Sequence, residues 1–234
     1  MKKLLLVLPM IALVAAANAQ SVEEIVKKNY LAQGYDKLQN ATSIYIVGKT
    51  IQMGTELPMV MQMKKDGKVK VTMTFNGMDI VTAFDGQKGW MINPMTGSDT
   101  PTEIPAEQLG EIKKNDMYHS QLQEFLNSGK LKLDGEEDVD GKPAYKLEAT
   151  QDSGSPIYFF IDKNSFLLVK TSVTVNAMGQ EMTVDSYVKE YADEGGFKFA
   201  KVSSTFINGQ ESGSVTFDKI ELNRQIDDSV FIMK

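Results

Sequence analysis

Apolar and polar residues alternate along most of this chain, which is typical of β-strands that have one buried face and one wetted face. The clearest case is residues 69–75, where Val69, Val71, Met73 and Phe75 alternate with lysine and threonine. The same alternation recurs at 145–150, 167–175, 182–188 and 215–217. Each run is long enough for one strand of ordinary length.

Tight-turn signals separate these runs. Asp-Gly or Asn-Gly pairs, in which both residues accept a positive φ, stand at 66–67, 76–77, 85–86, 140–141 and 208–209. Hairpins at such short intervals predict an antiparallel meander of about ten or more strands. A sheet of that size must curl, and its concave side then needs apolar cover.

Two segments have helical spacing instead. Ser21 and Glu24 have the spacing of a capping box at the start of an apolar stripe, and Gly34 is a suitable stop. Residues 101–129 form a second segment, in which Pro105 suits a first helical turn. We expect two short helices in this insertion. They either cover the concave face as a plug or lid, or pack at the edge of the sheet.

Methionine is concentrated in one part of the chain, because eight of the fourteen methionines lie between Met53 and Met95. Several stand at every second position, which puts their side chains on one face of a strand. Methionine is unbranched and polarizable, so such a face can adapt to ligands of different shape, whereas leucine, isoleucine and valine define a core better. We therefore predict an apolar ligand surface, with plain core packing as an equally supported alternative.

The candidate lining residues are Met59, Met61, Met63, Val71, Met73, Phe75, Trp90 and Met91. Since Trp90 and Met91 are adjacent, a regular strand turns at most one of them to the concave side.

The N-terminus has the features of a secretory signal peptide. Lys2 and Lys3 precede an apolar stretch, and Ala17-Asn18-Ala19 is a small-x-small cleavage site, so we predict a signal peptide over 1–19 and one domain over 20–234. No other run is long enough to span a bilayer, so no stable membrane anchor is expected. The predicted location is the bacterial periplasm. The chain contains no cysteine, and therefore no disulfide.

The charge balance narrows the range of partners. The net charge is −6, and it becomes −8 once Lys2 and Lys3 leave with the signal peptide. Such an acidic chain is a poor match for nucleic acid or for an anionic lipid surface.

Catalytic and metal-binding patterns are missing from the sequence. A single histidine, His119, in a polar stretch leaves no material for a serine-hydrolase triad or a histidine-rich metal site. The acidic run 136–141 fails as a calcium loop because Leu147 stands where a glutamate is required, so it is interpreted as a hairpin turn. We expect no catalytic residue, no metal and no cofactor.

Four segments, in order along the chain, resemble those of the LolA-like superfamily of periplasmic lipoprotein carriers. They are the hairpin F-D-G-Q-K-G-W-M-I-N-P at 84–94, the strand G-K-P-A-Y-K-L at 141–147, the strand–Asp–strand hairpin at 157–170, and the closing segment E-L-N-R-Q-I-D-D-S-V-F at 221–231. The initial helix is also similar.

The resemblance implies a mainly β fold with a few helices: a strongly curved antiparallel sheet that forms an incomplete barrel, with helices covering its concave face. It also implies a non-enzymatic, monomeric carrier that shelters lipoprotein acyl chains or another lipid there and exchanges them with an envelope donor or acceptor protein. Other members sense envelope stress, so a sensor or scaffold that binds a protein partner is the alternative function. Carriers of the family place an arginine on an early strand, whereas residues 61–75 here contain Lys64, Lys65, Lys68 and Lys70 and no arginine.

Overall fold

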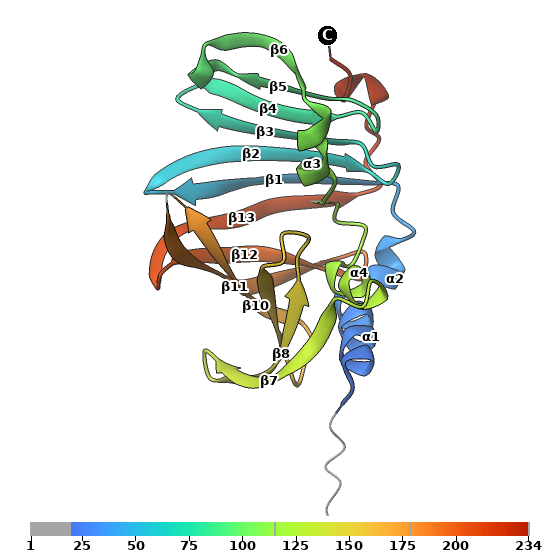
Figure 1. Ribbon diagram of the computed structural model, residues 1–234. Coiled ribbons are helices and arrows are strands. Elements are labelled where there is room, and N and C mark those ends of the chain that lie inside the picture. The colour runs from blue at the N-terminus through green and yellow to red at the C-terminus, as the bar shows by residue number, and fades with distance from the viewer. Residues whose placement is uncertain (1–19, 115, 178, 234) are drawn as a thin grey trace, which may run out of the picture.

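The computed structural model of the protein describes residues 20–114, 116–177 and 179–233 (Figure 1). The predicted signal peptide, 1–19, lies outside this range. The helices are α1 (Val22–Gln33), α2 (Tyr35–Leu38), α3 (Leu109–Lys114) and α4 (Gln121–Asn127), with short 3-10 turns η1 (Pro94–Thr96), η2 (Ala106–Gln108) and η3 (Asp228–Val230). The strands are β1 (Ser43–Gln52), β2 (Thr55–Lys64), β3 (Val69–Phe75), β4 (Met78–Phe84), β5 (Gly89–Asn93), β6 (Ser98–Ile104), β7 (Leu131–Val139), β8 (Lys142–Thr150), β9 (Pro156–Asp162), β10 (Leu168–Ala177), β11 (Gln180–Glu194), β12 (Phe197–Ile207) and β13 (Gln210–Leu222).

All thirteen strands form one antiparallel sheet in the order β6-β5-β4-β3-β2-β1-β13-β12-β11-β10-β9-β8-β7. Every neighbouring pair is a hairpin except β1 and β13, which join the two ends of the described chain. Among the described strands, β6 and β7 are left as edges, so the sheet curls without closing. The predicted fold class, a mainly β incomplete barrel with a few helices, is confirmed.

Local sequence signals determine where the elements begin and end. The Ser21 hydroxyl accepts a hydrogen bond from the Glu24 backbone N–H and caps α1, and Gly34 ends the helix at φ 88°. The predicted Asp-Gly and Asn-Gly pairs all stand at turns, and their glycines have positive φ. Gly34 must be a glycine for a second reason, because a Cβ there would lie 2.0 Å from the carbonyl oxygen of Gly196.

The helices pack on one face of the sheet, which we call the inner face. Ile25 of α1 and Leu122 of α4 contact a cluster that includes Leu147 and Phe159 of β8 and β9. A second cluster joins Leu38 of α2 to strand residues Ile44, Ile46, Met63 and Phe199. In Figure 1 the strands β7 and β8 curl round towards α1 and α4, which makes the helix-bearing face the concave one.

The helical insertion is shorter than predicted. Residues 101–104 belong to strand β6, because Thr102 pairs with Met91 and Ile104 pairs with Gly89 of β5. Pro101 is tolerated there because β6 is an edge strand, where one backbone N–H can be missing. The two expected helices are α3 and α4. The acidic run 136–141 is mostly strand, since only Asp140 and Gly141 form its turn.

Candidate functional site

The strand register places seven of the eight candidate lining residues on the inner face. Met61 lies between Ile46 of β1 and Val71 of β3, and Met59 is directly opposite Met73. Residues paired in this way share a face of the sheet. The same pairing across β2 to β5 places seven candidate residues on the inner face: Met59, Met61, Met63, Val71, Met73, Phe75 and Met91.

Trp90 is the exception, because it lies on the opposite, outer face. It pairs with Ala83 of β4 and packs with Val81 in a small buried cluster. Its indole Nε1 donates a hydrogen bond of 2.7 Å to the carbonyl oxygen of Phe231. Trp90 is therefore a structural anchor for the C-terminal segment and is removed from the predicted lining.

The inner face is filled at the end where the helices lie. Met63 is 4% exposed there, and Met59, farther along β2 and opposite Met73, is 8% exposed. Met63 belongs to the cluster around Leu38 and Tyr118, and the half-buried Met61 packs against the same cluster. At this end the core-packing interpretation of the methionines is correct.

The other end of the inner face contains a groove of about 650 Å³. Leu57, Met73, Phe75 and Ile80 provide its apolar wall, and Thr205 and Val215 come from the neighbouring strands β12 and β13. This volume falls within the range of about 300–1,000 Å³ that is typical of small-molecule sites. Met73 and Phe75 are half-buried there, so part of each side chain faces the hollow.

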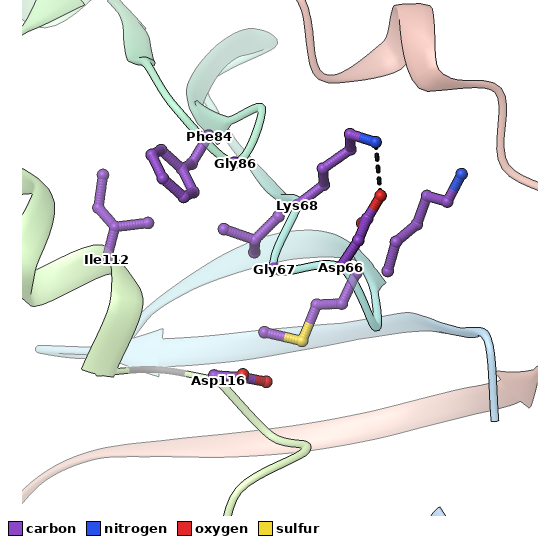
Figure 2. Close-up of a pocket in the computed structure, with 10 residues that line it drawn as sticks. Asp66, Gly67, Lys68, Phe84, Gly86, Ile112 and Asp116 are labelled. Atoms are coloured by element: carbon purple, nitrogen blue, oxygen red, sulfur yellow. Dashed lines mark hydrogen bonds and ion pairs between the residues drawn. The ribbon is translucent and has the colours of Figure 1, made fainter. Parts of the chain in front are cut away.

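A smaller pocket of about 220 Å³ lies beneath α3 (Figure 2). Ile112 of α3 and Phe84 of β4 form its apolar side together with Met63 and Val69. Lys68 and Asp66 form an ion pair of 2.6 Å at its polar rim. The pocket is smaller than most ligand sites, but it shows that α3 covers the inner face rather than an edge of the sheet.

The lysines near the β2–β3 turn connect the sheet to η3 and to the end of α2. Lys64 forms an ion pair with Asp228 of η3, and Lys68 contacts the same carboxylate at 3.1 Å. Hydrogen bonds from these lysines lower the pKa of Asp228, and the bonds to Asp66 and Asp228 raise the pKa of Lys68. Lys65 donates to the carbonyl oxygen of Gln39, just after α2. The strand region where the carriers have an arginine is therefore fixed to α2 and to the C-terminal segment.

A polar hollow of about 370 Å³ lies between the end of α1, β12 and the loop before α4. The exposed His119 lies in it, with its Nδ1 2.6 Å from a carboxylate oxygen of Asp116. Within the described residues, no three histidine, aspartate or glutamate side chains are grouped so as to hold a metal ion. None of the described helices is long and apolar enough to cross a membrane.

Several groove residues were missed by the sequence prediction. Leu57 and Ile80 continue the alternation on β2 and β4, so an extension of the pattern by one or two positions would have found them. Thr205 and Ser214 carry no comparable signal, because they are small polar residues on long, half-buried strands.

Comparison with known proteins yields matches of fold and none of sequence. No protein family model matches the chain, and no curated protein matches it either. A domain from Vibrio parahaemolyticus named for outer membrane lipoprotein sorting superposes with a TM-score of 0.62 at 10% identity, over 90% of this chain and 95% of that one. A LolA superfamily protein from Nitrosomonas europaea has a TM-score of 0.59 at 14% identity, with 92% and 98% of the two chains covered. For a DUF1329 family protein from Desulfovibrio piger the TM-score is 0.60 at 14% identity, with 89% and 97% covered. At such identities the likeness shows a common fold.

Proposed function

We propose that this chain, which has the fold of LolA superfamily and lipoprotein-sorting proteins, is a periplasmic carrier for a hydrophobic ligand. The ligand is the acyl chain of a lipoprotein or of another lipid, and it lies on the inner face of the sheet. The observation that carries the proposal is the groove of about 650 Å³ with Leu57, Met73, Phe75 and Ile80 in its wall.

The energetics suit a carrier that needs no polar recognition. Burying one methylene group stabilises by about 0.8 kcal/mol, so a dozen methylenes contribute about 10 kcal/mol before the costs of binding. Release is then the harder step. A wall that includes Met73 adapts to the ligand without gripping it rigidly, which favours transfer to an acceptor without nucleotide hydrolysis.

Localisation and partners follow from the same proposal. The predicted signal peptide would export the chain, and the fold is that of a lipoprotein-sorting domain. We infer a monomeric, non-enzymatic protein that receives its ligand from one envelope protein and delivers it to another. A sensor or scaffold that binds a protein partner on the same face is the competing function.

The test compares ligand uptake by matched variants. The mature protein is purified, analysed by native mass spectrometry and organic extraction, and titrated with a fluorescent fatty acid. Met73→Glu and Phe75→Glu should each weaken probe binding by tenfold or more, because a carboxylate in the groove must be desolvated when an acyl chain enters. Val60→Glu is the control, since Val60 is half-buried on the outer face of β2, opposite Thr72.

Circular dichroism and thermal melting establish that the variants are folded. The proposal fails if the protein carries no lipid and ignores both fatty-acid and lipopeptide probes. It also fails if Val60→Glu reduces uptake as much as Met73→Glu. A stoichiometric protein, instead of a lipid mass, in the purified sample would favour the sensor or scaffold.

A further inference from the structure

One rim of the sheet carries most of the exposed apolar side chains. Of the nine exposed large apolar side chains in the described part of the chain, five belong to this rim. Their exposed fractions range from 36% for Ile51 to 91% for Met53. We call this set the apolar rim: Ile51, Met53, Met78, Met95 and Val175.

The apolar rim is assembled from four separate hairpins. Met53 is in the turn between β1 and β2, Met78 follows the β3–β4 turn, Met95 is in η1 between β5 and β6, and Val175 is near the end of β10. Because the strands are antiparallel, alternate turns lie at the same end of the sheet. These turns are the hairpin ends on the left side of Figure 1, away from α1, α2 and α4.

Charge distinguishes the hairpin turns of the apolar rim from the turns at the other end of the sheet. Lysine and aspartate crowd the opposite turns, as in the contacts of Asp66 with Lys68 and of Asp193 with Lys198. The turns at the apolar rim consist of uncharged residues, such as Met53-Gly54, Asn76-Gly77 and Asn208-Gly209. The nearest charges in sequence include the acids Asp79, Asp99, Glu181 and Glu211, a short distance behind the turns.

The apolar rim is continuous with the groove. Ile51, Met53 and Met95 contribute to the lining of the groove of about 650 Å³, whose wall also includes Met73 and Phe75. Single exposed apolar residues are common on protein surfaces, but a group gathered around the mouth of an apolar groove marks a contact site.

We propose that the apolar rim docks on a zwitterionic lipid surface, so that an acyl chain passes between the bilayer and the groove without crossing water. The second part of this statement rests on the proposed function. The occupant is a bilayer because uncharged, apolar side chains on separate hairpins can enter the headgroup region together. It is zwitterionic because the acids behind the turns would be repelled by anionic headgroups.

The test is co-flotation with vesicles made of phosphatidylcholine and phosphatidylethanolamine. The double variant Met78→Glu/Val175→Glu removes two rim residues that are not part of the groove lining. The matched control is Leu31→Glu/Leu133→Glu, at positions 54% and 37% exposed in α1 and β7. Wild type and control should float to the same extent, and the rim variant should lose at least tenfold in vesicle partitioning. Replacing a third of the lipid by phosphatidylglycerol should weaken the binding of the wild type.

Fatty-acid uptake in the absence of vesicles separates the two proposals. The rim variant should take up the fluorescent probe like the wild type, because its groove lining is intact. If the wild type floats with the vesicles but takes up no probe, the docking proposal stands and the proposed carrier function is overturned. Docking is overturned if the wild type does not float, if the control loses as much partitioning as the rim variant, or if binding increases with phosphatidylglycerol.

Discussion

The indole of Trp90 and the backbone of Phe231, which are 141 residues apart in sequence, are joined by a hydrogen bond of 2.7 Å on the outer face of the sheet. Both residues are buried, and Phe231 is fully so. This contact fastens the C-terminal segment to β5. It explains why the only tryptophan is placed on the face opposite the groove.

Trp90→Phe should lower the free energy of unfolding by about 1–3 kcal/mol, because the variant leaves the buried carbonyl of Phe231 without its donor. Urea titration followed by circular dichroism measures the effect, since the variant contains no tryptophan to monitor. An unchanged unfolding midpoint would mean that water replaces the indole N–H at no cost.

The position of Trp90 also predicts a fluorescence result. A ligand in the groove should leave the emission of the wild-type protein nearly unchanged, because the groove and the indole are on opposite faces of the sheet. In the double variant Trp90→Phe/Phe75→Trp, the new indole is part of the groove wall, and its emission should shift to shorter wavelength when a saturated fatty acid binds. A blue shift in the wild type and none in the double variant would place the ligand elsewhere.

Tyr118→Phe should stabilise the protein by about 1 kcal/mol, because the Tyr118 hydroxyl is buried and has no hydrogen-bond partner among the described residues. Burial, with a smaller contribution from Asp116, raises the pKa of Tyr118 above its ordinary value of 10.0. The neutral phenol is therefore favoured in the folded state. Ionisation of Tyr118 therefore leaves the free energy of unfolding unchanged below about pH 10 and lowers it as the pH rises above that value.

The pH dependence provides the control for this variant. Urea unfolding at pH 8 and pH 11 should show a smaller loss of stability for Tyr118→Phe than for the wild type. Some loss remains, because burial also raises the pKa of Tyr35 to about 12. A variant that is less stable than the wild type at both pH values would show that the hydroxyl has a partner, such as a bound water.

Most of the fold could be predicted from the sequence because its signals are local. The alternation at 69–75 matches the bounds of β3, and Ser21, Glu24 and Gly34 delimit α1. The Asp-Gly and Asn-Gly pairs stand at turns since few other residues accept a positive φ. The boundaries at 101–104 and 136–139 were misplaced, because neither the proline-containing edge strand β6 nor the acidic end of β7 has an alternating apolar pattern.

The site could be predicted only in part. The depth of a groove and the burial of a strand residue beneath a helix depend on contacts between residues that are far apart in sequence. Period-two spacing put Met59, Met63 and Met73 on one face, but it could not reveal that α2 buries Met63 while Met73 faces a groove. The partner of Trp90 lies at the far end of the chain, so no local pattern indicated it. Met53 and Met95 were counted with the other methionines. Because Met53 precedes Gly54 and Met95 follows Pro94, their sequence positions already indicated exposed side chains at hairpin turns.

Pro101 in the edge strand β6 has a consequence for the behaviour of the protein in a crowded compartment. A sheet that never closes leaves unpaired amide and carbonyl groups on which a foreign strand could grow. Proline supplies no amide, and the other edge, β7, carries Glu136, Glu137 and Asp138 in succession. Both edge strands therefore resist pairing with strands of other molecules, so the protein can keep its groove open without aggregating.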